Sequence, residues 1–309
     1  MADRPVGVLV MAYGTPASPD DVEAYYTHIR GGRPPTPELL ADLRRRYRAI
    51  GGTSPLAART RAQVEGVRAA LGDGFAVALG QKHAAPFVED GAADLLAAGA
   101  EEVVGLVLAP HYSALSVGQY HQRAAAAVEA GGASYRGIGA WHRHPALVSL
   151  LAERVAEARA RLGGAAGAAV ETVFTAHSLP ERARTLDDPS YPDQLEATAR
   201  AVAGAARLDR WRVAWQSAGR TADRWIGPDL LEVLRSLPAE GVDAVVVCPA
   251  GFTSDHLEVL FDVDVEARRV AAEAGLALER TASFNDDPRF VALLASLVVG
   301  ELSGRPAGR

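Results

Sequence analysis

The run Val6-Gly7-Val8-Leu9-Val10-Met11-Ala12 decides the fold class, because it is apolar without alternation. A strand of this kind is expected where helices cover both faces of a parallel sheet. Similar short runs recur along the chain, and longer segments with helical spacing separate them. The predicted strands are 6–12, 75–79, 103–108, 134–138, 170–175, 212–215, 244–248 and 277–278.

The alternation of strands and helices predicts an α/β protein with right-handed crossovers between parallel strands. The predicted helices include 55–71, 117–130, 145–162, 192–205, 256–274 and 288–302. Eight strands divide into two Rossmann-like lobes, each a four-stranded parallel sheet flanked by helices. The exits of the strands at 103–108 and 244–248 are weakly alike, which hints at duplicated lobes. We predict an N-terminal lobe of residues 1–112 plus 286–309 and a C-terminal lobe of residues 113–285.

Composition excludes several classes of protein. The 309 residues carry 32 basic and 38 acidic side chains, a net charge of −6, which argues against nucleic acid as the main partner. The single cysteine, Cys248, is expected to be a buried, inert thiol that can form neither an internal disulfide nor an iron–sulfur cluster. The chain starts without a signal-peptide pattern, and no apolar stretch reaches the roughly 20 residues of a membrane helix. We therefore expect a cytoplasmic protein that does not insert into membranes.

A histidine at the end of a predicted strand is the strongest candidate for chemistry. The segment Val173-Phe174-Thr175-Ala176-His177-Ser178-Leu179-Pro180 places His177 where the strand stops. Ligands of open α/β sheets bind beyond the carboxyl ends of strands, so His177 is a candidate ligand or base. The alternative is a histidine that is hydrogen-bonded beneath a loop.

An acidic pattern follows in the predicted helix 256–274. Glu258, Asp262 and Glu266 recur every fourth residue, which would place three carboxylates on one helix face. The residues between them are mostly apolar, which indicates a helix buried on more than one side. Like charges in such a position need compensation, and a cation with a preference for oxygen ligands would supply it. The alternative is a solvated helix face.

The N-terminal region is basic and aromatic. Its segments 25–33, 44–48 and 51–55 contain tyrosines and arginines, and arginines bind carboxylates through paired hydrogen bonds. Ser54 followed by Pro55 is typical of a helix start. An exposed amphipathic helix would carry the same arginines. No Gly-rich dinucleotide motif and no Gly-x-Ser-x-Gly motif is present.

Taken together, these segments resemble the ferrochelatase family over nearly the whole chain. The matching stretches are 9–16, 25–32, 50–56, 108–111, 176–180, 215–217, 225–228 and 251–262. The sequence is most similar to soluble coproporphyrin III ferrochelatases of Gram-positive type. The resemblance implies a chelatase-like fold and a lyase that inserts Fe²⁺ into coproporphyrin III, giving Fe-coproporphyrin III (coproheme) in haem biosynthesis.

The resemblance also implies roles for particular residues. His177 and Glu258 match the inner metal-binding and proton-accepting pair, and Asp262 and Glu266 match an outer acidic path for the cation. Tyr13 matches a tyrosine that can ligate iron in the product, which favours coproporphyrin because protoporphyrin-using relatives usually lack it. The positions that hold the macrocycle and its propionates are Arg30, Arg46, Tyr47, Ser54 and Tyr120. A further cleft pair, Lys82 and His83, has no assigned role.

We expect the two lobes to grip and bend the porphyrin while His177, with an unperturbed pKa near 6.5, accepts a proton. The resemblance implies Fe²⁺ as substrate, no permanently bound cofactor, a monomer, and downstream haem-pathway enzymes as partners. Three alternatives remain: a protoporphyrin IX ferrochelatase, a sirohydrochlorin cobalt or nickel chelatase, and a non-catalytic two-lobed protein that binds haem or a siderophore. Glu258 favours iron over the histidine-rich sites of the sirohydrochlorin enzymes.

Overall fold

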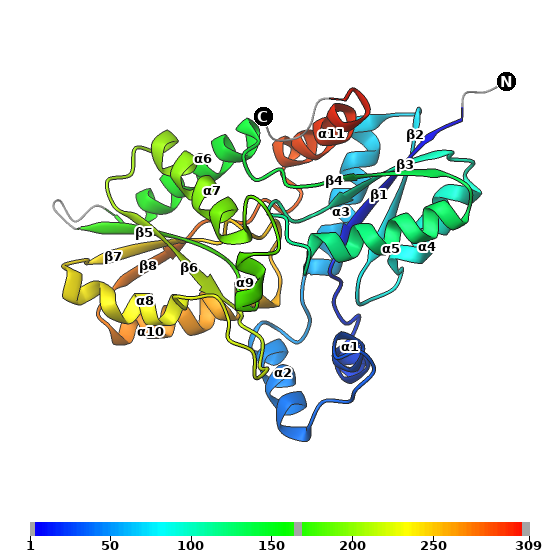
Figure 1. The fold of residues 1–309 in the computed structure, drawn as a ribbon. Coiled ribbons are helices and arrows are strands. Elements are labelled where there is room, and N and C mark those ends of the chain that lie inside the picture. The colour runs from blue at the N-terminus through cyan, green and yellow to red at the C-terminus, as the bar shows by residue number, and fades with distance from the viewer. Residues whose placement is uncertain (1–3, 164–168, 305–309) are drawn as a thin grey trace.

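The computed structural model describes residues 4–163 and 169–304, which contain two four-stranded parallel sheets flanked by helices (Figure 1). The first sheet has the order β2-β1-β3-β4 and the second the order β6-β5-β7-β8. The strands are β1 (Val6–Ala12), β2 (Phe75–Gln81), β3 (Glu102–Val107), β4 (Ser134–Ile138), β5 (Val170–His177), β6 (Trp211–Gln216), β7 (Ala244–Cys248) and β8 (Ala277–Arg280). Every predicted strand is present, so the predicted fold class is confirmed.

The two sheets have the same strand order, and every pair of neighbouring strands is parallel. The strands whose exits look alike in sequence, β3 and β7, are each the third strand of their sheet. We call the first sheet with its helices the first lobe and the second sheet with its helices the second lobe.

Helices cover both faces of each sheet, as the continuous apolar strands predict. In the first lobe α3 and α11 pack on one face and α4 and α5 on the other; in the second lobe α6 and α7 lie opposite α8 and α10 (Figure 1). The helices are α1 (Val22–Ile29), α2 (Pro37–Ala49), α3 (Leu56–Leu71), α4 (Val88–Ala97), α5 (Val117–Ala130), α6 (Pro145–Arg161), α7 (Tyr191–Ala205), α8 (Leu230–Ser236), α9 (Leu257–Leu260), α10 (Arg268–Glu273) and α11 (Pro288–Leu302). None of those in the described part of the chain combines the length and hydropathy that crossing a bilayer requires.

The two lobes share a hydrophobic core. One continuous cluster of buried side chains includes Leu106 from β3, Phe174 from β5 and Phe290 from α11. Helix α11 contacts α3 and β3 of the first lobe and also α6 of the second. Cys248, at the end of β7, is fully buried, and this burial raises the pKa of its thiol to about 12.

The predicted lobe boundary after residue 112 is wrong. Strand β4 pairs with β3, and α5 packs on β3 and β4, so both elements belong to the first sheet. Sheet membership therefore moves the boundary beyond Ile138. Residues 1–3, 164–168 and 305–309 of the predicted lobes lie outside the described residues.

The predicted helix 256–274 is not one α-helix. It consists of α9, a π-helix η4 (Asp262–Ala267) and then α10. In η4 the amide of Glu266 donates to the carbonyl of Phe261, five residues earlier, at 2.9 Å. Such π-helical turns are rare and occur often at functional sites.

A helical hairpin, α1–α2 (residues 22–49), stands apart from both sheets and lies at the bottom of the view in Figure 1. Its apolar side packs against the second lobe in a small cluster that joins Leu40 and Tyr47 to Leu257 and Phe261. The hairpin thus belongs by chain order to the first lobe but is docked on the second.

Candidate active site

A pocket of about 820 Å³ lies where strands of both sheets end. Tyr13 follows β1, His177 ends β5 and Gln216 ends β6, and all three line it. Its position agrees with the rule that open α/β sheets bind ligands at the carboxyl ends of their strands. The predicted residues that line the pocket are Tyr13, Arg46, Tyr47, Ser54, Tyr120, His177, Glu258, Asp262 and Glu266.

Arg30 is the predicted residue that is not in this lining. Its guanidinium lies over the ring of Tyr26, 5.8 Å from the centroid, and its Nε donates to the carbonyl of Arg33. Because Tyr26 lines the pocket, only the Tyr26 side chain separates Arg30 from the pocket.

His177 and Glu258 face each other at the base of the site. Nε2 of His177 lies 3.5 Å from Oε1 of Glu258. Nδ1–H of the same imidazole donates to the carbonyl of Ser178 at 2.5 Å, which fixes the ring with Nε2 toward the carboxylate. Tyr191 donates its hydroxyl to the His177 carbonyl at 3.1 Å and so holds the strand end.

The two side chains form an ion pair. Burial alone would lower the pKa of His177, but the Glu258 carboxylate and the hydrogen bonds outweigh it and raise the pKa to about 9. Burial alone would raise the pKa of Glu258, but His177 and His256 hold it well below its usual range. The ion pair therefore favours the doubly protonated form of His177, a shift from the unperturbed imidazole pKa considered from the sequence.

His256 is a neighbour of the pair that sequence reasoning did not single out. Its Nε2 lies 3.6 Å from Oε2 of Glu258, and its Nδ1 pairs with the Ser254 carbonyl at 3.1 Å. Gln216 adds a hydrogen bond from Nε2 to the backbone carbonyl of Glu258 at 3.0 Å. The available signal for His256 was its position within the family-like stretch 251–262.

Asp262 has partners within the protein. Arg46, from α2, forms an ion pair with one carboxylate oxygen, and the Ser217 hydroxyl donates to the other. Burial is the largest influence on the pKa of Asp262 and raises it to about 6, although Arg46 acts in the opposite direction. Arg46 was predicted to bind propionates and Asp262 to transfer the cation, but in the structure the two form an ion pair.

The acidic pattern was expected to need an external cation, but two of its three carboxylates have cationic partners within the protein. Asp262 is compensated by Arg46 and Glu258 by His177, so the protein supplies the positive charge itself. Asp262 and Glu266 both lie in the π-helix η4, and both line the pocket. Among the described residues, no three His, Cys, Asp or Glu side chains are close enough together to hold a metal ion.

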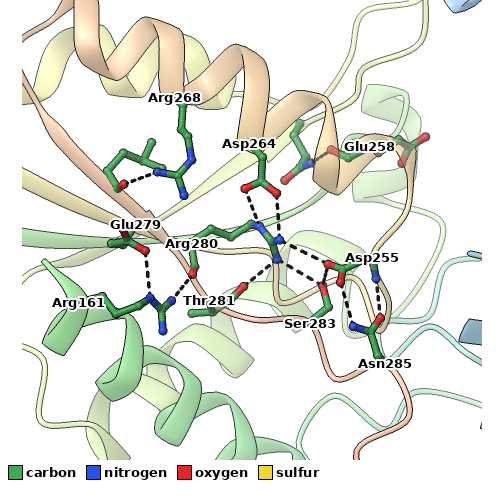
Figure 2. A network of polar contacts seen from close by, with 12 residues as sticks. Arg161, Asp255, Glu258, Asp264, Arg268, Glu279, Arg280, Thr281, Ser283 and Asn285 are labelled. Carbon is green, nitrogen blue, oxygen red and sulfur yellow. Dashed lines mark hydrogen bonds and ion pairs between the residues drawn. The ribbon is translucent and has the colours of Figure 1, made fainter. Parts of the chain in front are cut away.

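A polar network anchors the segment that carries Glu258 and Asp262 (Figure 2). Arg280, at the end of β8, donates through Nε and Nη2 to the two oxygens of Asp264 at 2.9 and 3.0 Å and lies 3.4 Å from Asp255. Ser283 and Asn285 donate to Asp255 at 2.8 and 2.9 Å. The start of α9 and the π-helix are therefore fixed to the same strand end.

The wall contributed by the first lobe is aromatic. The ring of Tyr13, 42% exposed, lies 4.6 Å from that of His83, whose Nδ1 pairs with Nδ1 of His28 at 2.9 Å. Lys82 lies over the ring of Tyr120, and burial together with Arg123 lowers its pKa to about 8.

Ser54 lies one residue before Pro55, which is the N-cap of α3 in place of the predicted Ser54. Its hydroxyl oxygen accepts from the amide of Leu56, the first residue of α3, at 3.2 Å. Tyr47 pairs with the Thr15 hydroxyl at 3.4 Å. The side chains of both residues are therefore held against the pocket by the elements around them.

Two parallel-sheet lobes also form the fold of solved chelatases. SirB from Bacillus subtilis, solved with Fe³⁺, matches with a TM-score of 0.63 at 12% identity, covering 98% of each chain. SirB from Bacillus subtilis subspecies spizizenii, solved with cobalt, matches with a TM-score of 0.61 at 13% identity over the same shares. At these identities the likeness shows the fold.

The chain belongs to the ferrochelatase family, whose family model matches residues 5–302. It is 43% identical to the coproporphyrin III ferrochelatase of Anoxybacillus flavithermus, covering 98% of both proteins. It is 41% identical to the coproporphyrin III ferrochelatase of Bacillus subtilis, over 98% of this chain and 99% of the relative. The ferrochelatase of Herpetosiphon aurantiacus is 42% identical, over 95% of this chain and 98% of the relative.

Proposed function

We propose that this protein inserts Fe²⁺ into coproporphyrin III and releases Fe-coproporphyrin III (coproheme) for haem biosynthesis. The observation that carries the proposal is the His177–Glu258 pair, held at 3.5 Å in a pocket of about 820 Å³. A volume of this order suits a ligand larger than most metabolites. Relatives more than 40% identical along nearly their whole length are named for coproporphyrin III, which supports this macrocycle.

Metal insertion has to remove two protons from the ring nitrogens while the metal loses part of its hydration shell. Glu258 offers a carboxylate oxygen to Fe²⁺, and His177 offers Nε2 beside it. While Nε2 carries a proton it can bind neither Fe²⁺ nor a pyrrole proton, so His177 must first release that proton to solvent. It then accepts one pyrrole proton, and the other pyrrole proton leaves to solvent. The Ser178 carbonyl keeps the ring oriented throughout, because it holds Nδ1–H.

The remaining residues hold the macrocycle and guide the cation. Tyr13 faces the pocket from the end of β1, where its hydroxyl would meet iron in the product, and Tyr47, Ser54 and Tyr120 form part of the same wall. Because the walls come from both lobes, a ring between them is gripped from two sides, which favours its distortion. Glu266 lies beyond Glu258 along the chain and would attract divalent cations, whereas Asp262 would do so only when Arg46 releases it. Arg30 would act from behind Tyr26.

The proposal extends to the setting of the enzyme. It acts in the cytoplasm as a monomer, without a permanently bound cofactor, and passes coproheme to a downstream haem-pathway enzyme. Its one cysteine cannot supply the thiolates of an iron–sulfur cluster.

The decisive experiment mixes the protein anaerobically with Fe²⁺ and an excess of coproporphyrin III and follows the absorption of the metallated ring. An enzyme converts many equivalents, whereas a haem-binding protein stops at one. Parallel assays with protoporphyrin IX and with sirohydrochlorin plus Co²⁺ compare kcat/KM for the alternative activities. A higher kcat/KM for either alternative would overturn the assignment to coproporphyrin III.

A further inference from the structure

The positive side chains of the pocket are divided between the lobes. Within the described residues, the lysines and arginines that line it are Arg46 and Lys82 from the first lobe and Arg182 and Arg220 from the second. These four side chains differ in how exposed they are and in whether they are already paired. Arg46 is 21% exposed and paired with Asp262, whereas the Arg182 and Arg220 side chains are 61% and 57% exposed.

Arg182 and Arg220 belong to neighbouring loops at the end of the second sheet. Arg182 lies in the 3₁₀-helix η2 (Glu181–Arg184) that follows β5, and Arg220 lies in the loop between β6 and α8. The two loops are joined, because the Glu181 amide donates to the Arg224 carbonyl at 2.8 Å. Parallel strands β5 and β6 thus deliver two guanidinium groups to the same rim of the pocket.

Asp42, the partner of Arg220, also accepts a hydrogen bond from Arg45. Nη2 of Arg220 lies 2.7 Å from Oδ2 of Asp42 on α2, while Arg45 donates to Oδ1 of the same carboxylate, also at 2.7 Å. Figure 1 shows the β6–α8 loop reaching toward α2. Asp42 would therefore keep one cationic partner if Arg220 turned to another carboxylate. Arg182 has a loose partner, with Asp223 at 3.7 Å.

The chemistry of the macrocycle supplies the carboxylates. Coproporphyrin III carries four propionate groups around its edge and protoporphyrin IX carries two, with vinyl groups at the other two positions. Carboxylates distributed around a flat ring need cations on more than one wall of the pocket, and arginine is the side chain best suited to bind them.

We propose that Arg182 and Arg220 bind propionates of the porphyrin from the second lobe and select the four-carboxylate macrocycle over the two-carboxylate one. This inference rests on the proposed function for its substrate. It assigns selectivity to the rim of the second lobe, apart from the His177–Glu258 pair and from the first-lobe wall.

Porphyrin binding without iron tests the proposal through quenching of porphyrin fluorescence. The double variant Arg182→Ala/Arg220→Ala should bind coproporphyrin III about tenfold more weakly, because each exposed ion pair contributes up to about fivefold. Its affinity for protoporphyrin IX should change less than about twofold, and the loss for coproporphyrin III should shrink at high salt. Arg224→Ala, in the same loop but outside the pocket lining, is the matched control and should bind like the wild type.

A second variant tests whether Arg220 binds the porphyrin or only holds its loop against α2. Asp42→Asn removes the carboxylate that competes for Arg220, so it should tighten the binding of coproporphyrin III. Weaker binding in this variant, or equal losses for both porphyrins in the double variant, would overturn the proposal. If the arginines control selectivity in binding but the wild type inserts no iron, the proposed function fails and this inference stands.

Discussion

Arg46 of α2 and Asp262 of the π-helix η4 form an ion pair that fastens the helical hairpin of the first lobe to the second lobe. Both side chains are largely buried, 21% and 10% exposed. The Arg46 guanidinium also lies over the ring of Phe261, 4.9 Å from its centroid. The hairpin is therefore held beside the His177–Glu258 pair by charge as well as by apolar packing.

Arg46→Met should lower the free energy of unfolding by roughly 3 kcal/mol, because it leaves Asp262 buried without its cation. The double variant Arg46→Met/Asp262→Asn should lose less than the sum of the two single variants. Urea denaturation measures both. Arg45→Met is the control, since Arg45 lies over the same ring but pairs at the surface, and it should cost less than about 1 kcal/mol. Equal losses of unfolding free energy for the two variants would mean that the buried pair contributes no more stability than the surface pair.

His177→Ala should nearly abolish iron insertion while porphyrin still binds. The variant removes the Nε2 atom that faces Glu258, which is the proposed proton acceptor, and loss of such a group costs about a hundredfold or more in kcat. Insertion is followed by absorption and binding by fluorescence quenching. Turnover at the wild-type rate would remove His177 from the mechanism.

Tyr13→Met should alter the absorption spectrum of the bound product more than the rate of insertion. The reason is that Tyr13 faces the pocket from the wall opposite the second lobe, where its hydroxyl would ligate iron after insertion. The two readouts are a spectrum of the enzyme–product complex and a steady-state rate. An unchanged spectrum would show that Tyr13 is not a ligand.

Two stacked, buried histidines should make stability depend on pH. His111 and His142 lie with ring centroids 5.5 Å apart, and burial lowers the pKa of His142 to about 4 and that of His111 well below its usual range. An unfolded histidine binds a proton near pH 6.5, so the stabilisation is present above that pH and falls as the pH drops toward 4.

Between pH 7 and pH 5 the wild type should lose about 2 kcal/mol more stability than His142→Gln, in which that proton uptake is absent. Urea denaturation of both proteins at the two pH values gives the difference. Parallel losses would show that His142 titrates alike in the folded and unfolded chains.

The strands and most helices could be predicted because their signals are local. The apolar run of β1 predicts a buried strand, and the proline that starts α11 predicts a helix start. The lobe boundary could not, because membership of β4 in the first sheet depends on hydrogen bonds to β3 and not on any break in composition.

The site could be predicted in part. His177 was singled out because it ends a predicted strand, and Glu258 because it opens a series of carboxylates at every fourth position; the structure brings the two within 3.5 Å of each other. The pairing of Arg46 with Asp262 was missed, because it joins segments more than two hundred residues apart. The π-helix was missed as well, since carboxylates at every fourth position are equally compatible with an α-helix.

His177 at the end of β5 and Glu258 after β7 are suspended from one and the same sheet. A hinge motion between the sheets would widen or narrow the pocket while leaving the separation of these two groups unaltered. Such a motion would therefore change access for a bulky planar ligand without changing the geometry of the pair proposed to receive the ion. The Arg46–Asp262 contact between α2 and η4 would hold the hairpin on the second lobe throughout such a motion.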